Sequence, residues 1–364
     1  MKVVIAAWHL KNVNVGLGRY ANGLIEAIGR VDRDNQYEIL IPNDSHPFSP
    51  RPNMRYRLIR FPLFKRRFWE QLAPLLAGRH DVLHFPYDSR VAWKRAKFVT
   101  TIHDVKPLLF ETGRRRRNLN HVIERTLVGS RWGQIDHVVT VSECSRCDIM
   151  AHLGLPKDRL TVVYPGIDLE RFRPALAGSP KTSAARPYVL CVAGADPTKN
   201  LEVLIDAFAR LPSAVRAAHD LVLTGDFRRR ADLRARVAQS GIQAQSIFTG
   251  VVSDERLIEL YRAAAVFVFP SLYEGFGLPV LEAMACGCPV ISSDASSLPE
   301  VAGEAAVLVD PRDVGGLASA MERVLGGADV RLALRERGLE QAARFPWERT
   351  ARETIAVYRN VVGE

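Results

Sequence analysis

The sequence lacks three features that would each assign a class of protein. Its apolar runs fall well short of the roughly 20 residues that a membrane-spanning helix needs. The apolar start, residues 1–8, is too short for a signal peptide and is typical of a first β-strand. The five cysteines are an odd number, and neither Cys144-x-x-Cys147 nor Cys286-x-Cys288 is matched by a second pair at zinc-ligand spacing. These absences predict a cytoplasmic protein whose thiols are reduced and structural.

Length and charge suggest two domains of different character. A chain of 364 residues exceeds what one hydrophobic core usually supports, and 47% apolar and 25% charged residues are ordinary for a globular protein. Residues 1–175 carry 29 Lys and Arg against 17 Asp and Glu, a net charge of +12. Residues 176–364 carry 21 against 23, a net charge of −2. We therefore expect the basic surface to lie on the N-terminal domain.

The basic residues of that domain form three clusters. They are Lys65-Arg66-Arg67, Lys94-Arg95 with Lys97, and Arg114-Arg115-Arg116-Arg117, and the first is interleaved with Phe61, Leu63, Phe64, Phe68, Trp69 and Leu72. A basic amphipathic segment of this kind favours the surface of an anionic membrane, so we expect a protein that is cytoplasmic and peripheral to that membrane. A solvated face remains the alternative. No nucleic-acid-binding motif accompanies the charge, so we expect no nucleic-acid partner.

Strands alternate with helices along the whole chain. The predicted strands are Val3–Ala7, Tyr37–Ile41, Tyr56–Phe61, Asp81–Phe85, Phe98–Ile102, His137–Val141, Tyr188–Ala193, Asp220–Thr224, Ser246–Thr249, Ala265–Phe269, Val290–Ser293 and Ala306–Val309. The predicted helices are about Arg19–Gly29, Leu201–Arg210, Arg229–Ser240, Asp254–Ala263, Leu278–Gly287, Val314–Leu325, one from about Val330, and a last one after Trp347. This alternation predicts an α/β protein with parallel sheets. A stretch of small residues and proline, 175–187, is typical of an exposed linker.

Ligands bind at the carboxyl ends of strands in such sheets. His84, His103-Asp104 and Ser142-Glu143 meet that condition in the N-terminal half. The His103-Asp104 pair also fits a Ser-His-Asp hydrolase, but the sequence has no Gly-x-Ser-x-Gly elbow to present a nucleophile. Structural roles stay open for His84 and His137. Gly16-Leu17-Gly18 stands at a helix start, where another molecule can approach the backbone. A nicotinamide site is disfavoured because seven residues separate Trp8 from Gly16 and no acidic residue ends the second strand.

The stretch Pro270–Gly287 concentrates the strongest chemical signal. It joins a buried strand to a glycine-rich loop and to a helix that Pro279 starts. Backbone N–H groups and the positive end of the helix dipole at such a junction suit a diphosphate. Glu274 and Glu282 bracket this anion site, and carboxylates repel phosphate but accept hydrogen bonds from sugar hydroxyls. An ordinary βα turn with two surface glutamates is the alternative.

Glu274 and Glu282, with Gly275-Phe276-Gly277-Leu278-Pro279 between them, resemble the E-x7-E signature of the retaining nucleotide-sugar glycosyltransferases of the family-4 type. The resemblance implies the GT-B fold, in which two Rossmann-like, doubly wound parallel-sheet domains face a central cleft. The domains would be residues 1–175 with a returning C-terminal helix, 347–364, on the acceptor side, and residues 186–345 on the nucleotide-sugar side. The resemblance extends over nearly the whole chain, most strongly at Gly16–Gly18, Lys199 and Glu274–Glu282.

The resemblance also implies roles for individual residues. Glu282 would bind the nucleotide ribose, Glu274 the transferred hexose, and Lys199 the departing phosphate, with His103 beside the donor sugar. His103, Lys199 and Glu274 are the implied catalytic residues, and His103 with Asp104 lies on the acceptor side. The implied donor-binding residues are Gly16, Gly18, Ser142, Gly194, Lys199, Val251, Glu274, Gly275, Phe276, Gly277, Leu278 and Glu282. The family usually has Arg-Lys where this chain has Thr198-Lys199, which leaves open whether Arg19 or a neighbour compensates.

The implied reaction transfers a hexose, of mannose or glucose type, from a GDP- or UDP-linked donor to a saccharide or lipid-linked saccharide. Front-face attack, with the leaving phosphate taking the acceptor proton, would retain the anomeric configuration. Metal-dependent transferases of the other common fold carry Asp-x-Asp after a buried strand, whereas Asp32-Arg33-Asp34 follows a helix and is typical of a solvated turn. We therefore expect neither a metal nor a cofactor. A nucleotide-sugar-binding protein without catalysis and a nucleoside diphosphate-sugar epimerase are the alternatives.

Overall fold

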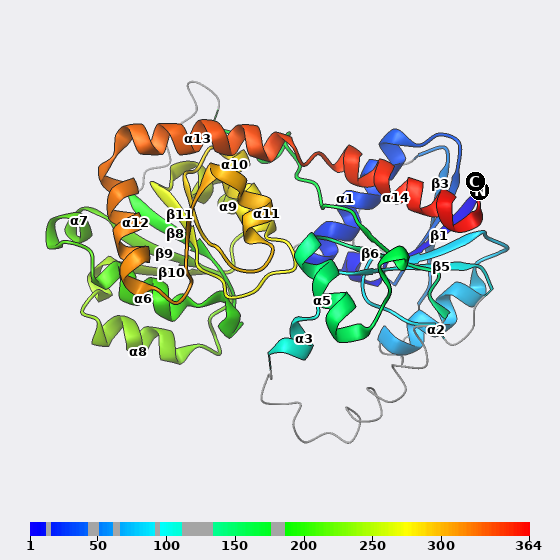
Figure 1. Ribbon diagram of the computed structural model, residues 1–364, viewed down its shortest axis with the longest axis horizontal. Coiled ribbons are helices and arrows are strands. Elements are labelled where there is room, and N and C mark those ends of the chain that lie inside the picture. Colours follow the sequence, from blue (N-terminus) through cyan, green and yellow to red (C-terminus); the bar gives the residue numbers. More distant parts are fainter. Residues whose placement is uncertain (12–15, 43–50, 61–65, 92–94, 111–133, 176–185) are drawn as a thin grey trace, which may run out of the picture. The chain divides into compact units, whose positions relative to one another are not determined.

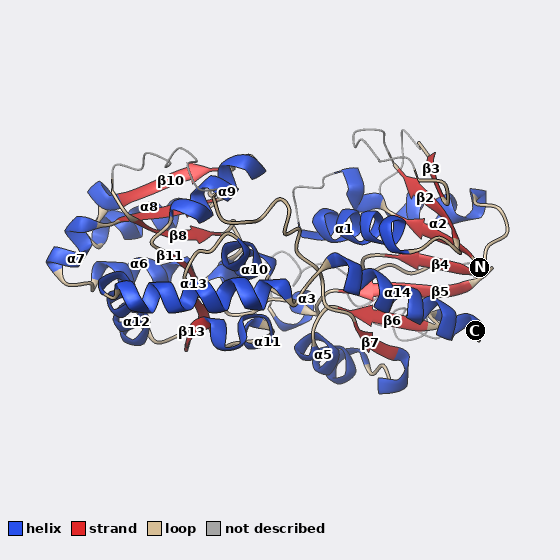
Figure 2. Cartoon of the chain, turned by 90° about the horizontal axis from the view of Figure 1, so that it is seen from above, coloured by secondary structure: helices blue, strands red, loops and turns tan. Residues whose placement is uncertain are grey.

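The computed structural model describes residues 1–11, 16–42, 51–60, 66–91, 95–110, 134–175 and 186–364 (Figure 1). The chain divides into two compact units. Unit 1 comprises Met1–Gly166 and Phe345–Glu364, and unit 2 comprises Ile167–Arg344. Each unit holds one parallel β-sheet, whose strands are drawn in red in Figure 2. This confirms the predicted α/β fold with two doubly wound sheets.

The sheet of unit 1 has the strand order β3-β2-β1-β4-β5-β6-β7. Its strands are β1 (Lys2–Ala6), β2 (Gln36–Ile41), β3 (Met54–Leu58), β4 (Val82–Phe85), β5 (Lys97–Ile102), β6 (His137–Thr140) and β7 (Leu160–Val162). Its helices are η1 (Trp8–Lys11), α1 (Gly16–Val31), α2 (Arg66–Leu76), α3 (Lys106–Leu109), α5 (Glu143–Leu153), η3 (Lys157–Arg159) and α14 (Trp347–Val362). The last helix, α14, packs along α1 (Figure 1).

The sheet of unit 2 has the strand order β10-β9-β8-β11-β12-β13. Its strands are β8 (Tyr188–Val192), β9 (Asp220–Thr224), β10 (Ser246–Gly250), β11 (Val266–Phe269), β12 (Val290–Ser293) and β13 (Ala306–Val309). Its helices are η4 (Pro197–Lys199), α6 (Leu201–Ala209), α7 (Ser213–Ala218), α8 (Ala231–Gln239), η5 (Gln243–Gln245), α9 (Asp254–Ala263), α10 (Leu278–Ala285), α11 (Leu298–Ala302), η6 (Gly303–Ala305), α12 (Val314–Gly326) and α13 (Ala328–Ala343).

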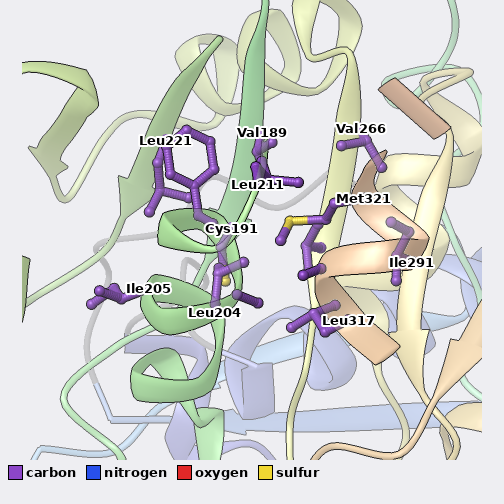
Figure 3. Close-up of a cluster of buried hydrophobic side chains, with 14 of the residues drawn as sticks. Val189, Cys191, Leu204, Ile205, Leu211, Leu221, Val266, Ile291, Leu317 and Met321 are labelled. Atoms are coloured by element: carbon purple, nitrogen blue, oxygen red, sulfur yellow. The ribbon is translucent and has the colours of Figure 1, made fainter. Parts of the chain in front are cut away.

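Each unit has its own hydrophobic core between its sheet and its helices. In unit 2 the side chains of the central strands meet those of α6 and α12, as Val189, Leu204 and Met321 illustrate in Figure 3. These three side chains are fully buried. Leucine, isoleucine and valine dominate the cluster, as expected for parallel strands that are covered on both faces. The separate core supports our description of unit 2 as a domain of its own.

The strand orders place one switch point in each sheet. In unit 2 the chain adds β9 and β10 on one side of β8 and then crosses to add β11 on the other side. In unit 1 the corresponding central pair is β1 and β4. Loops that leave the carboxyl ends of two such strands diverge and leave a crevice, which is where open α/β sheets bind ligands. The loops after β8 and β11 therefore locate the candidate site of unit 2.

The structure differs from the sequence-based expectations in a few places. Helix α1 begins at Gly16, earlier than predicted, so Gly16 and Gly18 lie in its first turn, where the N–H groups need no partner within the helix. The pattern did not predict α2, α5 or β7. The three-residue strand β7 is too short for an alternation to show, and α5 has a mixed composition with little amphipathic character.

The Asp32-Arg33-Asp34 turn is not solvated in the way that the sequence suggested. Asp32 is buried, and its carboxylate accepts hydrogen bonds from Asn35 Nδ2 at 2.6 Å and from the Tyr37 hydroxyl at 2.5 Å. Burial alone would raise the pKa of Asp32, but the bonds from Asn35, Tyr37 and nearby N–H groups bring the pKa below its ordinary value. Asp34 is exposed. Asp32 therefore organises a buried turn, and the expectation of a solvated turn was wrong for this residue.

Candidate functional site

The candidate site of unit 2 is built on the loops that follow β8 and β11. Lys199 ends η4 after β8, and its Nζ lies 2.6 Å from Glu274 Oε1 in the loop after β11. Both side chains are largely buried, with 20% and 13% of their surfaces exposed. Lys199 Nζ also stands 5.0 Å from the centroid of the Phe269 ring, a cation–π contact. The fold thus brings together two predicted site residues that are 75 positions apart.

Thr198, which stands where the family usually has arginine, has a structural role in this chain. Its N–H and its hydroxyl both donate to Asp196 Oδ1, at 3.0 and 2.9 Å. Asp196 caps the η4 turn in this way, and Thr198 is buried. Lys199 is then the cation that this turn presents beside Glu274.

The loop between Glu274 and α10 has the backbone geometry that the sequence predicted. Helix α10 begins at Leu278 with Pro279 in its first turn. Gly277 has φ +118°, and an added Cβ would lie 2.6 Å from Leu298 Cδ2, so both conformation and space require glycine there. Phe276 is buried, while Gly275 and Leu278 are half-buried. At the start of α10 the Val280 N–H donates to the Gly277 carbonyl at 3.0 Å and Pro279 has no N–H. The N–H groups of Gly277 and Leu278 are therefore the ones that can meet an anion at this junction.

Glu282 lies in the second turn of α10 and is buried with 4% of its surface exposed. Its Oε2 accepts a hydrogen bond of 3.1 Å from the hydroxyl of Tyr261 in α9. Tyr261 is fully buried and therefore fixes the direction of the carboxylate. Tyr261 could not be predicted from the sequence, because a partner on a neighbouring helix leaves no local pattern.

Gly194 and Val251 lie at the ends of other strands of the same sheet. Gly194 follows β8, and an added Cβ there would meet nothing within 4 Å. Val251, with 77% of its surface exposed, follows the edge strand β10 and lines a pocket of about 320 Å³ with Phe227 and Phe248. Two strand spacings, roughly 10 Å, separate β10 from β8. The Glu274 loop follows β11, the next strand beyond β8, and the expected closeness of Val251 to that loop stays a prediction.

In unit 1 the predicted residues gather around His103, which follows β5. His103 Nε2 lies 3.2 Å from the Pro86 carbonyl, and its ring meets the edge of Tyr20 at 4.6 Å between centroids. Burial lowers the pKa of His103, although the Pro86 carbonyl and Asp104 oppose that shift. Because Tyr20 lies in α1, the first turn with Gly16 and Gly18 belongs to the helix that packs on His103. An added Cβ at Gly16 would meet nothing within 4 Å.

Asp104 and Ser142 have local partners in the structure. Asp104 Oδ1 accepts from the Lys106 N–H at 2.9 Å, at the start of α3. Ser142 is fully buried, and its Oγ accepts from the Ser145 N–H at 3.0 Å as the N-cap of α5. Ser145 Oγ in turn donates to the His103 carbonyl at 2.8 Å. These bonds tie the ends of β5 and β6 together around His103.

His84 and His137 are held within the framework of unit 1. His84 is fully buried between the Tyr358 hydroxyl, at 2.6 Å, and Thr101 Oγ1, at 2.9 Å. Burial, with a smaller contribution from His103, lowers its pKa to about 3. His137 Nε2 lies 2.8 Å from Thr161 Oγ1. The structural role that the sequence left open applies to both histidines.

The basic clusters lie only in part within the described residues. Lys65, Lys94 and Arg114–Arg117 lie outside them, and nothing is described of the Arg67 side chain. Arg66 forms an ion pair with Glu70 at 2.5 Å and approaches Asp88 at 3.7 Å. Trp69 is buried and donates to the Ile59 carbonyl at 2.9 Å, whereas Phe68 has 58% of its surface exposed. Arg66 is therefore paired within unit 1 and Trp69 packs in its interior, whereas Phe68 is the exposed aromatic residue of α2.

The described part of the chain shows neither a membrane-spanning helix nor a cluster of metal ligands. No helix there is long and apolar enough to cross a bilayer. No group of three or more His, Cys, Asp or Glu side chains there is arranged as metal ligands. All five cysteines are free, as expected.

Two protein families match the chain in succession. Residues 15–171 match the family described as Glycosyltransferase Family 4, and residues 174–341 match Glycosyl transferases group 1. Together the two matches extend over most of both units.

Individual relatives match over most of the chain as well. The O-antigen chain mannosyltransferase B of Escherichia coli is 29% identical, with 99% of this chain and 100% of that protein aligned. A D-inositol 3-phosphate glycosyltransferase of Saccharomonospora viridis is 30% identical over 78% of this chain and 71% of its own length. Among solved structures, sucrose-phosphate synthase of Thermosynechococcus elongatus superposes with a TM-score of 0.77 and 22% identity, over 100% of this chain and 99% of that one.

Proposed function

The chain belongs to the glycosyltransferases of the family-4 type with the GT-B fold, and we propose that it moves a hexose from a nucleoside diphosphate sugar to a saccharide acceptor. The observation that carries this proposal is the Lys199–Glu274 pair beside the start of α10. A cation and the positive end of the α10 dipole suit the diphosphate, and a carboxylate next to them suits the hydroxyls of the attached hexose.

Each donor group has a counterpart in unit 2. Glu282, oriented by Tyr261, would accept hydrogen bonds from the ribose diol. Gly194, which leaves open space after β8, would let the diphosphate approach the backbone. The pocket at Val251, across the sheet, would take the nucleobase. The roles implied for these residues remain proposals.

We propose that the anomeric configuration is retained. The bond from the anomeric carbon to the phosphate oxygen breaks, and the acceptor oxygen forms its new bond on the same face of the sugar. The proton of the acceptor hydroxyl goes to the departing phosphate oxygen, so no carboxylate nucleophile is required. Lys199 and the N-terminus of α10 would stabilise the negative charge that develops on that phosphate. No metal ion has a part in this scheme.

The acceptor is assigned to unit 1. The net positive charge of unit 1 favours an anionic acceptor, such as a saccharide linked to a lipid diphosphate. His103 and Asp104 are the proposed acceptor-side residues. We further propose that unit 1 meets an anionic membrane through its basic clusters, which would place the enzyme at the inner face of the cell membrane.

The test is a panel of GDP- and UDP-linked mannose and glucose, with released nucleoside diphosphate as the readout. We expect slow release from one donor without acceptor, and faster release when a suitable saccharide is added. Proton NMR of the product then gives the anomeric configuration. Binding without release would favour a regulator, and a change within the donor sugar without release would favour an epimerase. An inverted product would contradict the front-face scheme.

A further inference from the structure

The loop after β12 holds the Glu274 loop in place. Strand β12 pairs with β11, so the loops at their carboxyl ends lie next to each other. Ser296 in the second loop has φ +58°, a left-handed conformation that serine rarely adopts. Glycine would adopt this conformation with less strain. The surrounding structure must therefore offset the strain of this backbone, and the contacts of the hydroxyl are one source of that stabilisation.

Two hydrogen bonds join Ser296 to the main chain of the Glu274 loop. Ser296 Oγ accepts from the Glu274 N–H at 3.2 Å and donates to the Glu274 carbonyl at 2.6 Å. The neighbouring Ser297 Oγ lies 2.9 Å from the same carbonyl and 2.7 Å from the Phe276 carbonyl. One hydroxyl thus engages both polar groups of a single residue. This bridge fixes the peptide units on either side of the Glu274 Cα.

Fixing the main chain also fixes the direction of the side chain. The Glu274 carboxylate lies 2.6 Å from Lys199 Nζ and 2.5 Å from Ser271 Oγ, and Ser293 Oγ donates to the Ser271 carbonyl at 2.6 Å. Serine hydroxyls therefore hold this loop from both strands. A loop held in this way is preorganised, so its carboxylate need not be ordered when the substrate arrives.

We propose that Ser296 is a positioning residue that aims Glu274 at the transferred hexose. The inference rests on the proposed function, because Glu274 must act on the donor for its position to matter. The Ser296 hydroxyl bonds to the N–H and the carbonyl of Glu274, so we place its effect on the reaction through Glu274. Its hydroxyl, rather than its backbone conformation, supplies that effect.

Two β-branched substitutions separate the effect of the Ser296 hydroxyl from that of its backbone conformation. Ser296→Thr keeps the hydroxyl and Ser296→Val replaces it with a methyl group of similar size, so both impose the same strain at φ +58°. Ser296→Gly removes the hydroxyl and relieves the strain. Ser246→Ala is the matched control, because Ser246 Oγ is part-buried and bonds to the Ile242 carbonyl at the far end of β10.

Measurements of kcat and donor KM should distinguish positioning of Glu274 from a contribution to donor binding. We expect kcat of Ser296→Val and Ser296→Gly to fall by roughly 10- to 100-fold, the cost of a small misplacement of a catalytic group, with donor KM changed less than threefold. Ser296→Thr should recover much of kcat relative to Ser296→Val. Ser246→Ala should match the parent. Equal kcat for the Thr and Val variants, or a loss confined to KM, would overturn the proposal.

A double-mutant cycle tests whether the effect passes through Glu274. If it does, Ser296→Val should cost little further kcat in a Glu274→Gln background, because the group that it positions is already lost. Multiplying losses would overturn the proposal. Calorimetric binding of the nucleoside diphosphate product should stay within threefold of the parent in all variants. If the parent neither binds nor turns over any nucleotide sugar, the proposed function itself fails, a result distinct from an unequal or additive Ser296 series.

Discussion

Lys199 Nζ and Glu274 Oε1 lie 2.6 Å apart in a site where most of both side chains is buried. We assign the ammonium group to the diphosphate and the carboxylate to the hexose. The two side chains would then contact the groups on either side of the bond that breaks. A diphosphate brings a second set of negative oxygens to Lys199. The Coulomb attraction that holds Glu274 is then shared, and its oxygens become available to sugar hydroxyls. On this basis the loop that carries Lys199 and the loop that carries Glu274 form one site rather than two independent sites.

The two glutamates should therefore respond differently to substitution. Glu274→Ala should lower kcat by roughly 100-fold, since its contact strengthens as the sugar reacts. Glu282→Ala should mainly raise the donor KM, by roughly 10- to 100-fold, because a ribose contact is the same before and during the reaction. Tyr261→Phe should raise KM less, since it frees Glu282 without removing it. Parent-like turnover of Glu274→Ala on an active donor would contradict the assignment.

Local sequence pattern predicted the strands and the Glu274 loop, because each depends on neighbouring residues. Buried strands such as β9 and β12 have the predicted bounds, and Ser253 is the N-cap of α9. Pro279 located the start of α10. These features need only a run of apolar residues, a cap or a proline, so the local sequence predicts them directly.

Partners across the sheet could not be predicted in this way. Ser296 bonds to Glu274 only because β11 and β12 are neighbours, and that adjacency follows from the strand order. Tyr261 meets Glu282 through helix packing. Asp32 was mistaken for a solvated residue because its buried partners, Asn35 and Tyr37, are themselves polar. A strand order inferred from the family resemblance would have been the signal for Ser296.

Asp32 should stabilise unit 1 through its charge. Its folded pKa lies below the unfolded value of about 3.8, so its contribution is fully present above that pH and is lost as pH falls through the folded pKa. Asp32→Asn should lower the free energy of unfolding at pH 7 by about 1–3 kcal/mol, as its buried donors lose a charged acceptor. The difference from the parent should shrink below pH 3.8.

Chemical denaturation from pH 7 to pH 3 measures this effect, and Asp34→Asn is the matched control. Asp34 belongs to the same turn but is exposed, with Arg359 only at 4.0 Å. Its substitution should change stability by less than about 0.5 kcal/mol at every pH. A pH-independent difference between Asp32→Asn and the parent would show that shape, rather than charge, holds the turn.

Chelation should leave transfer activity unchanged. We expect this because the charge on the leaving diphosphate is assigned to Lys199 and to the start of α10. The measurement compares initial rates in EDTA with rates after added magnesium or manganese. Activity that EDTA abolishes and manganese restores would contradict the proposed scheme and would return attention to Asp32 and Asp34.

Membrane binding should depend on the exposed part of α2 and on the basic residues next to it. Each basic residue near an anionic leaflet contributes on the order of 1 kcal/mol, which fades within a Debye length, so binding should fall steeply with salt. Lys65→Gln with Arg67→Gln, and Phe68→Ser, should each reduce co-sedimentation with phosphatidylserine vesicles. Arg66 is left intact because it pairs with Glu70.

A control on the other unit makes the membrane test specific. Leu332, in α13, has 55% of its surface exposed, close to the 58% of Phe68. Leu332→Ser should leave co-sedimentation unchanged. If the α2 variants also bind like the parent, this surface is excluded, and the remaining basic clusters to neutralise are Arg114–Arg117 and Lys94-Arg95 with Lys97.

The bounds of unit 2 sharpen a test of how the two substrates are divided. The sequence suggested that the second domain starts at residue 186, and residues 167–175 also belong to unit 2. Arg171 Nη2 lies 2.8 Å from Asp254 Oδ2, and Arg262 Nε donates to the Arg173 carbonyl at 2.7 Å. A fragment of residues 167–344 should therefore unfold at a higher temperature than one of residues 186–345.

The longer fragment should bind nucleotide but transfer nothing. All donor contacts assigned to Lys199, Glu274 and Glu282 lie within it, so its affinity for the nucleoside diphosphate should stay within roughly one order of magnitude of the full chain. The acceptor-side residues, His103 and Asp104, belong to unit 1, and a fragment without them cannot bring an acceptor hydroxyl to the anomeric carbon. Calorimetry and a radiolabelled transfer assay measure the two properties separately. Transfer by the fragment, or a folded fragment that binds no nucleotide, would show that donor and acceptor are not divided between the units in this way.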